Sequence, residues 1–133
     1  ENEVWSYGEE NYDIMLKFIH IREMMRDYTR NIMKEAHETG APVMRALFYE
    51  FPEDGVCWEI KDAYMFGSDI LVAPICYEKA AKRMVYLPVG ASFVHAGSGR
   101  WYEGGKWYEI EADIHTIPIF LKEGRQEYLI GKI

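Results

Sequence analysis

The sequence has few cysteines and no long apolar run. Its 133 residues include only Cys57 and Cys76, and neither has a CxxC partner or a histidine at metal-ligand spacing. We expect two free thiols in a reducing compartment, which favours a cytoplasmic location. No segment reaches the roughly 18 consecutive apolar residues that are needed to cross a bilayer. The sequence therefore predicts no metal site, no other cofactor and no membrane contact.

Basic residues are outnumbered by acidic ones. The sequence has 15 Lys and Arg against 22 Asp and Glu, which gives a net charge of −7. A nucleic-acid partner requires clustered basic residues, so we expect none. The histidines form no HExxH pattern, the serines lie in no GxSxG turn, and no glycine-rich phosphate loop follows a strand. The composition fits a protein that acts on neutral small molecules.

Apolar residues, in contrast, are abundant enough for a packed core. The sequence is 49% hydrophobic and 15% aromatic, and its length suits one domain or a part of a larger protein. It begins at Glu1 without an initiating Met, so we expect a processed chain or a piece of a longer polypeptide.

A long helix is predicted from Asn11 to Thr39. Gly40 is suited to end it, and Pro42 prevents its continuation. Apolar residues recur there in steps of three and four, at Ile14, Phe18, Ile21, Met25, Tyr28, Ile32 and Ala36.

A buried strand and a second helix are predicted next. Residues 41–51 (APVMRALFYEF) are apolar on both alternating faces, as in a strand of a parallel sheet. Residues 56–66 have apolar positions at helical spacing, and Gly67 follows as a stop. Helix, strand and helix in this order are typical of an α/β barrel or a doubly wound sheet.

After Gly67 the pattern becomes all-β. A Gly104-Gly105 turn between aromatic residues predicts a β-hairpin over residues 100–110. Further strands are predicted over residues 69–75, 82–90, 91–97, 115–124 and 127–133. The sequence thus predicts an α+β chain with an antiparallel β-sandwich. The helix-strand-helix segment needs neighbours unless this sheet supplies them, which favours a C-terminal piece of a larger enzyme.

Three carboxylates and one arginine in residues 44–54 are candidates for chemistry. Glu50, Glu53 and Asp54 end the predicted strand, and a glycosidase pair needs carboxyls about 5–10 Å apart. Pro-Glu-Asp-Gly is also ordinary turn and N-cap sequence, and we favour that interpretation. Arg45 lies in an apolar strand, where a guanidinium must be paired. We expect a structural brace, with a substrate contact as the alternative.

Aromatic residues around the Gly-Gly turn are candidates for sugar binding. Trp101, Tyr102, Trp107 and Tyr108 flank it, and exposed aromatic faces stack on sugar rings. Cross-strand aromatic pairs also stabilise hairpins without a ligand, which is the simpler interpretation. Trp101 and Trp107 are kept as candidate substrate-binding residues.

Six blocks of the sequence, taken together and in order, resemble the C-terminal part of glycoside hydrolase family 31, which contains α-glucosidases and α-xylosidases. The blocks are WSYGEE (5–10), GAPVMRALFYEFPED (40–54), DAYMFGSDILVAPI (62–75), VYLPVG (85–90), YEGG (102–105) and TIPIFLKEG (116–124).

The resemblance implies a placement in that family's fold. Residues 1–67 would be the helix-strand-helix end of the catalytic (β/α)8 barrel, and residues 68–133 the proximal C-terminal β-sandwich. Family members hydrolyse α-linked glycosides with retention through two aspartates on earlier barrel strands. No position here matches those motifs, so no catalytic residue is assigned.

The resemblance also implies a function for the whole enzyme. An α-linked oligosaccharide would be the substrate of the full-length protein, and the chain alone would be inactive. Exposed barrel-segment surface would favour a homo-oligomer. The alternatives are a stand-alone carbohydrate-binding or interaction module and a self-sufficient domain without a ligand.

Overall fold

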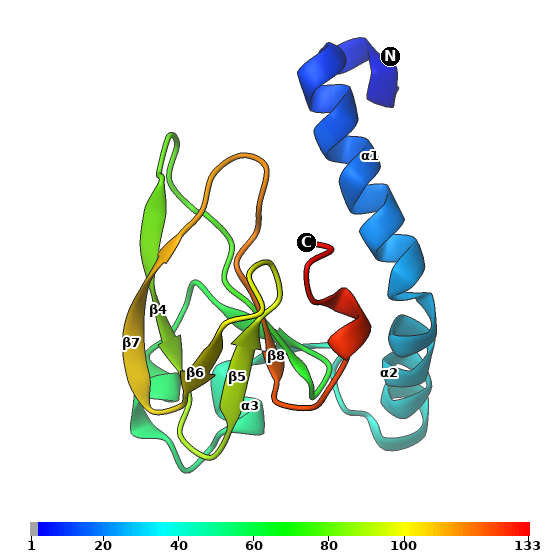
Figure 1. Cartoon of the computed structure of the whole chain (residues 1–133). Coiled ribbons are helices and arrows are strands. Elements are labelled where there is room, and N and C mark those ends of the chain that lie inside the picture. Colours follow the sequence, from blue (N-terminus) through cyan, green and yellow to red (C-terminus); the bar gives the residue numbers. More distant parts are fainter. Residues whose placement is uncertain (1–2) are drawn as a thin grey trace.

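The computed structural model, which describes residues 3–133, has a bent helix along one side of a two-sheet β structure (Figure 1). The helical elements are η1 (Val4–Tyr7), α1 (Glu9–Met24), α2 (Arg26–Thr39), α3 (Leu47–Glu50), η2 (Gly55–Trp58) and η3 (Glu127–Leu129). The strands are β1 (Met44–Ala46), β2 (Tyr64–Phe66), β3 (Ile70–Val72), β4 (Lys82–Leu87), β5 (Ser92–His95), β6 (Trp101–Glu103), β7 (Lys106–Glu111) and β8 (Ile119–Lys122).

The helices α1 and α2 form one long helix that bends at Met25. The predicted helix from Asn11 to Thr39 is confirmed, except that the backbone leaves helical geometry at Met25 (φ −89°, ψ 4°). Met25 still donates its N–H to the carbonyl of Ile21 (3.1 Å) and accepts the N–H of Thr29 (2.8 Å), so hydrogen bonding continues through the bend. Gly40 ends α2 in the left-handed conformation at φ 78°.

The strand predicted over residues 41–51 is shorter than expected and pairs differently. β1 pairs antiparallel with β2, and not parallel as a barrel strand would. After Ala46 the chain turns into α3, which places Leu47 in the core without exposed surface. Of the apolar residues that suggested a strand buried on both sides, Leu47 and Phe51 are buried, whereas Met44, Phe48 and Tyr49 are exposed.

The prediction of a second helix over residues 56–66 is wrong. The structure has the short 3-10 turn η2 there, followed by the strand β2. In β2, Tyr64 and Phe66 pack toward the helices while Met65 packs into the other core. A short apolar run does not distinguish helical from strand periodicity, which explains the error.

Two further predictions about the C-terminal half are wrong. The Gly104-Gly105 turn does not close a hairpin, because β6 pairs with β5 whereas β7 pairs with β4 in another sheet. The turn is a corner at which the chain changes sheets. A Cβ on Gly104 would lie 2.2 Å from the carbonyl oxygens of Pro88 and Ala91, so no side chain fits there. Residues 127–133, predicted as a strand, contain the turn η3 and bury Leu129.

The antiparallel sheets that the sequence predicts are present. A six-stranded sheet has the order β1-β2-β3-β8-β5-β6, and β4 and β7 form a second, two-stranded sheet. The large sheet crosses the division predicted at residue 67, since β1 and β2 precede that residue and β3 follows it. The class is α+β, with antiparallel sheets beside helices.

The large sheet is covered on both faces, which makes three layers. Leu71 and Phe120 belong to the core between the two sheets, together with Val85 and Ile110 of the small sheet. On the opposite face, residues of β3 and β8 pack against α1, α2 and the C-terminal turn in a second core. This second core contains Ile21, Tyr28, Ile32, Ile70, Val72, Ala96, Ile119, Leu121, Leu129 and Ile133. Burial on both faces explains why β3 and β8 read as unbroken apolar runs.

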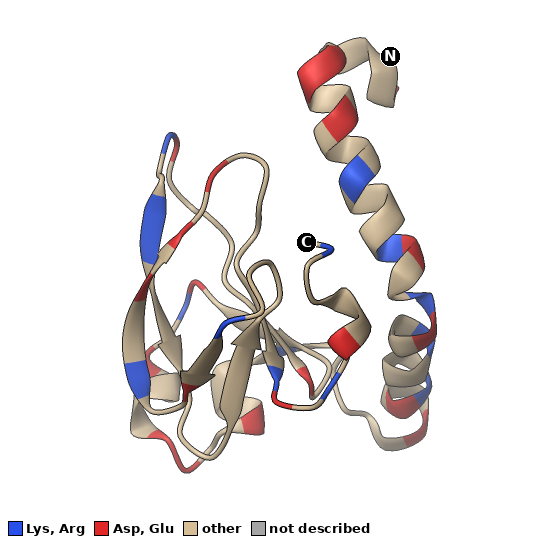
Figure 2. Ribbon diagram, viewed as in Figure 1, with Lys and Arg blue, Asp and Glu red and all other residues tan. Residues whose placement is uncertain are grey.

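Charged residues are distributed over the whole ribbon. Lys and Arg alternate with Asp and Glu along the helices and on the strands and loops (Figure 2). Among the described residues, no helix is both long and apolar enough to cross a membrane.

Candidate functional site

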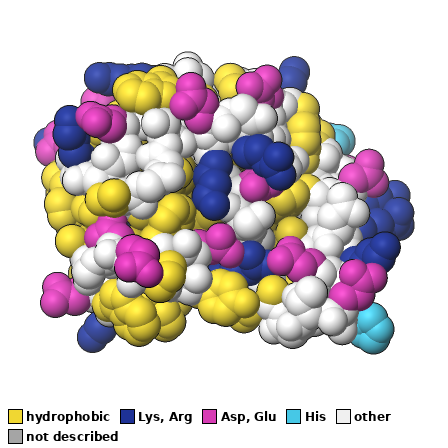
Figure 3. Space-filling view, turned by 90° about the horizontal axis from the view of Figure 1, so that it is seen from below, with side chains coloured by type: hydrophobic (Ala, Val, Ile, Leu, Met, Phe, Trp, Pro, Cys, Tyr) yellow, Lys and Arg dark blue, Asp and Glu magenta, His cyan; other side chains and the backbone are white. Residues whose placement is uncertain are grey.

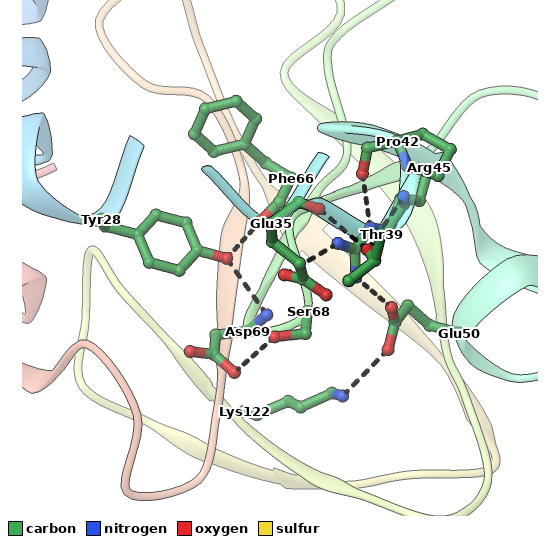
Figure 4. Close-up of polar contacts among 11 residues, drawn as sticks. Tyr28, Glu35, Thr39, Pro42, Arg45, Glu50, Phe66, Ser68, Asp69 and Lys122 are labelled. Carbon is green, nitrogen blue, oxygen red and sulfur yellow. Dashed lines mark hydrogen bonds and ion pairs between the residues drawn. The ribbon is translucent and has the colours of Figure 1, made fainter. Parts of the chain in front are cut away.

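The carboxylates after β1 fall into two separate structural groups. Glu50, at the end of α3, forms an ion pair with the Arg45 guanidinium, and its other oxygen lies 3.7 Å from Lys122 Nζ (Figure 4). Asp54 lies further along, at the N-cap of η2. Glu53, between them, is exposed to solvent.

Arg45 is the centre of the first group and joins the helical layer to the sheet. Its side chain is 2% exposed and contacts Glu50 of α3 and, through Nη2 at 3.2 Å, Glu35 of α2. Its Nε donates to the carbonyl of Pro42. Burial alone would lower the pKa of Arg45, but the two carboxylates outweigh it and raise that pKa above its usual value. All these partners belong to the neighbouring helices and the backbone, as expected for a buried guanidinium with a structural role.

Asp54 is the centre of the second group and fixes the loop after α3. One oxygen accepts the N–H of Val56 (3.1 Å), and the other accepts the Tyr86 hydroxyl (2.7 Å) and the N–H of Val89 (2.9 Å). Burial would raise the pKa of Asp54, but these donors and the Cys57 thiol lower it instead. A glycosidase general acid needs a raised carboxyl pKa. Asp54 is therefore suited to capping and not to proton donation.

A second polar link between helix and sheet, which was not predicted from the sequence, runs through Tyr28. The Tyr28 hydroxyl donates to the carbonyl of Phe66 (2.5 Å) and accepts the N–H of Asp69 (3.2 Å) (Figure 4). Burial raises the pKa of Tyr28 to about 12. A Cβ on Gly67 would lie 2.3 Å from this hydroxyl, so Gly67 allows the close approach. A polar-tipped aromatic on the apolar stripe of a helix was the available sequence signal.

The two candidate tryptophans lie in different sheets. Trp101 belongs to the edge strand β6 of the large sheet and is 52% exposed. Trp107 belongs to β7 of the small sheet, is 51% exposed and contacts the Tyr86 ring at 5.3 Å. Because the Gly-Gly turn is a corner, the structure does not place them together as one hairpin surface.

Trp107 borders a hollow of about 320 Å³ on the small sheet. The hollow has an aromatic and aliphatic wall and a charged rim. Its lining consists of Asp62, Ile75, Cys76, Tyr77, Ala80, Lys82, Arg83, Met84 and Trp107. Asp62, Tyr77 and Arg83 come from separate segments and form no sequence motif, so they were not predicted as site residues.

Among residues 3–133, no group of three His, Cys, Asp or Glu side chains gathers in a way that could hold a metal ion. Both cysteines are free thiols, with Cys57 buried and Cys76 exposed.

Comparisons of the sequence and of the structure with known proteins indicate the same family. Residues 40–125 match the family model described as the glycosyl hydrolase family 31 C-terminal domain. The structure of a family 31 α-xylosidase from a soil metagenome, in complex with xylose, is 44% identical with a TM-score of 0.94, over 98% of this chain and 19% of that one. A Flavobacterium johnsoniae dextranase in complex with isomaltotriose is 33% identical with a TM-score of 0.89, over 93% of this chain and 15% of that one.

A curated relative agrees with these structures. α-Glucosidase 2 of Bacillus thermoamyloliquefaciens is 39% identical over 122 residues, which make up 92% of this chain and 15% of the relative. The chain thus spans less than a fifth of the length of each of these relatives.

Proposed function

Because the chain belongs to glycoside hydrolase family 31, we propose that it is the C-terminal part of a retaining α-glycosidase of the α-xylosidase or α-glucosidase type. The whole enzyme would hydrolyse O-glycosyl bonds of an α-linked oligosaccharide. The observation that carries this proposal is that nearly the whole chain superposes on a small part of a family 31 α-xylosidase.

We assign no catalytic residue to this chain. Its candidate acids have structural partners: Glu50 is paired with Arg45, and Asp54 accepts three hydrogen bonds. Both sets of partners support a role in holding the helices and loops in place. The isolated chain is therefore expected to be inactive.

The barrel placement is part of the same proposal. The helices α1 and α2 would belong to the end of the catalytic barrel, and the β-sandwich would support it. The exact division at residue 67 remains a prediction, because the family match begins at residue 40 and the large sheet extends across residue 67.

The two free thiols support a cytoplasmic location.

The test has two arms that use the same substrates. The isolated chain is assayed with aryl α-xyloside and aryl α-glucoside, and we expect no turnover. A chimera in which this chain replaces the matching segment of the soil-metagenome α-xylosidase should hydrolyse the xyloside with retention. Hydrolysis by the isolated chain that is lost in Glu50→Gln or Asp54→Asn would overturn the proposal. A folded chimera without activity would also count against it.

Self-association of the isolated chain is a further part of this proposal. Hydrophobic side chains form patches on the side where α3 lies (Figure 3). Phe48 and Trp58 are exposed and stack at 4.4 Å, and Met33 on α2 is 58% exposed. We expect sedimentation velocity to show concentration-dependent dimers. A monomer at all concentrations would contradict this expectation.

A further inference from the structure

We propose that the hollow beside Trp107 binds one or two pyranose rings of a neutral oligosaccharide. The proposal concerns this chain alone, and only the choice of sugar used as the probe rests on the function proposed above. It is carried by the shape of the hollow, by one preorganised aromatic wall and by one preorganised carboxylate.

The aromatic wall is held in place from behind. Trp107 lies directly opposite Tyr86 in the β4–β7 ladder, and the two rings contact at 5.3 Å with an angle of 54°. The Tyr86 hydroxyl is fixed in turn by Asp54 at 2.7 Å. One side of the indole is thus supported while about half of its surface stays open to solvent. A supported, exposed aromatic face loses little conformational entropy when a ligand stacks on it.

The carboxylate on the rim is held by a largely buried guanidinium. Arg83 donates to the carbonyls of Pro74 (2.6 Å), Asp62 (3.0 Å) and Met84 (3.2 Å). Its Nη2 lies 3.0 Å from Asp62 Oδ1. The other carboxylate oxygen, Oδ2, has no partner in the described part of the chain, and the Asp62 side chain is 54% exposed. Arg83 therefore orients an open hydrogen-bond acceptor at the edge of the hollow.

The charge and size of the hollow favour a neutral sugar. Asp62 and Arg83 form an ion pair, and Lys82 lies 3.3 Å from Glu109, so the rim has no large excess of either charge. Met84 and Ile75 add apolar lining to the hollow. A pyranose ring has an apolar C–H face and a rim of hydroxyl donors, which match this wall and Asp62 respectively. A volume of about 320 Å³ is at the lower end for small-molecule sites and suits a short segment of a glycan.

Cys76 provides a chemical probe of occupancy, because it lines the hollow and is exposed. Cys57 does not interfere, since it is fully buried and burial raises the pKa of its thiol to about 12. The alkylation rate of Cys76 in the 133-residue chain is measured against increasing isomaltotriose and maltotriose. We expect saturable protection at millimolar sugar. Sorbitol has similar hydroxyls but no ring face, so it should give no protection.

The variants separate binding from a purely structural role of the indole. Trp107→Ala should weaken protection at least about tenfold, which corresponds to the loss of one aromatic contact. Asp62→Asn should weaken it less, since an amide oxygen still accepts a hydrogen bond. Trp101→Ala is the matched control, because Trp101 is equally exposed but does not line the hollow. It should leave protection unchanged, and circular dichroism checks that each variant is folded.

The outcomes decide the proposal independently of catalysis. Saturable protection that is lost in Trp107→Ala and kept in Trp101→Ala supports the site. No protection of the folded chain by either trisaccharide overturns it, and so does protection that both tryptophan variants retain. If Trp107→Ala does not fold, Asp62→Asn decides, and unchanged protection in that variant would overturn the site. Neither result depends on whether the isolated chain hydrolyses a glycoside.

Discussion

The β-sandwich and the helical layer differ in how completely their apolar residues are covered. All three residues of β3 are buried, and so are Ile119–Leu121 of β8. In contrast, α1 buries only Ile21 among its 16 residues, and α2 buries only Tyr28 and Ile32. A strand between two layers is covered on both faces, whereas a helix on the outside is covered on one. The sandwich has one core between its own two sheets and shares a second core with the helices, whereas the helices are held only by the contacts of that shared core and by polar links to the sheet.

Those contacts are polar as well as apolar. Arg45 links Glu35 of α2 to Glu50, and Tyr28 links α2 to the backbone around Gly67. Both links join the two regions, so changes there test how strongly the helices are attached.

The largest expected effect is in the sandwich core. Phe120 is fully buried and its ring contacts Tyr102 at 5.8 Å and His95 at 5.2 Å. Phe120→Ala should lower the free energy of unfolding by about 3–5 kcal/mol because it leaves a cavity. The comparison change on the outer side of the helical layer, Ile19→Ala, should cost no more than about 0.5 kcal/mol, since Ile19 is 42% exposed. Urea unfolding measures both, and equal losses would contradict the difference between the two regions.

Replacement of Arg45 should cause the next largest loss of stability. Arg45→Met leaves Glu35 and Glu50 without their buried partner, and we expect a loss of about 3 kcal/mol. Lys34→Met is the control, because the pair of Lys34 with Glu38 is exposed and 3.8 Å long. That control should change stability by less than about 0.5 kcal/mol. Adding Glu50→Gln to Arg45→Met should restore part of the loss, and no restoration would argue against the ion-pair explanation.

A smaller effect is expected where the helix approaches Gly67. Gly67 and Gly40 both have positive φ, +65° and +78°, so alanine strains the backbone at either position by about 1 kcal/mol. Only at Gly67 does the new Cβ meet Tyr28 and Ile32, at 2.3 and 2.7 Å. Gly67→Ala should therefore cost about 1–2 kcal/mol more than Gly40→Ala in thermal unfolding. Equal costs would mean that α2 is not held closely against this turn.

The sequence predicted the elements that local patterns determine. The helix to Thr39 and the strands β3, β4, β5 and β8 were found because apolar periodicity and neighbouring Gly or Pro residues determine them within a short window. The family resemblance, which the comparisons confirm, came from several such windows in order.

Pairing between distant segments was not predictable in the same way. The Gly-Gly corner is recognisable only once β5 and β4 are known to be the partners of β6 and β7. Residues 64–66 form a strand because β1 and β3 lie on either side of them. The hollow beside Trp107 was not predictable for the same reason, since Asp62, Tyr77 and Arg83 come together only in the folded chain.

Native-state hydrogen exchange of the 133-residue chain tests the central difference most directly, because it reports the two regions in one experiment. The account predicts the slowest exchange in β3 and β8, with amides of α1 exchanging on the order of a hundredfold faster because local opening exposes little additional apolar surface. If α1 proves as strongly protected as β8 in the monomeric chain, the helical layer is a complete part of this fold and the account is contradicted.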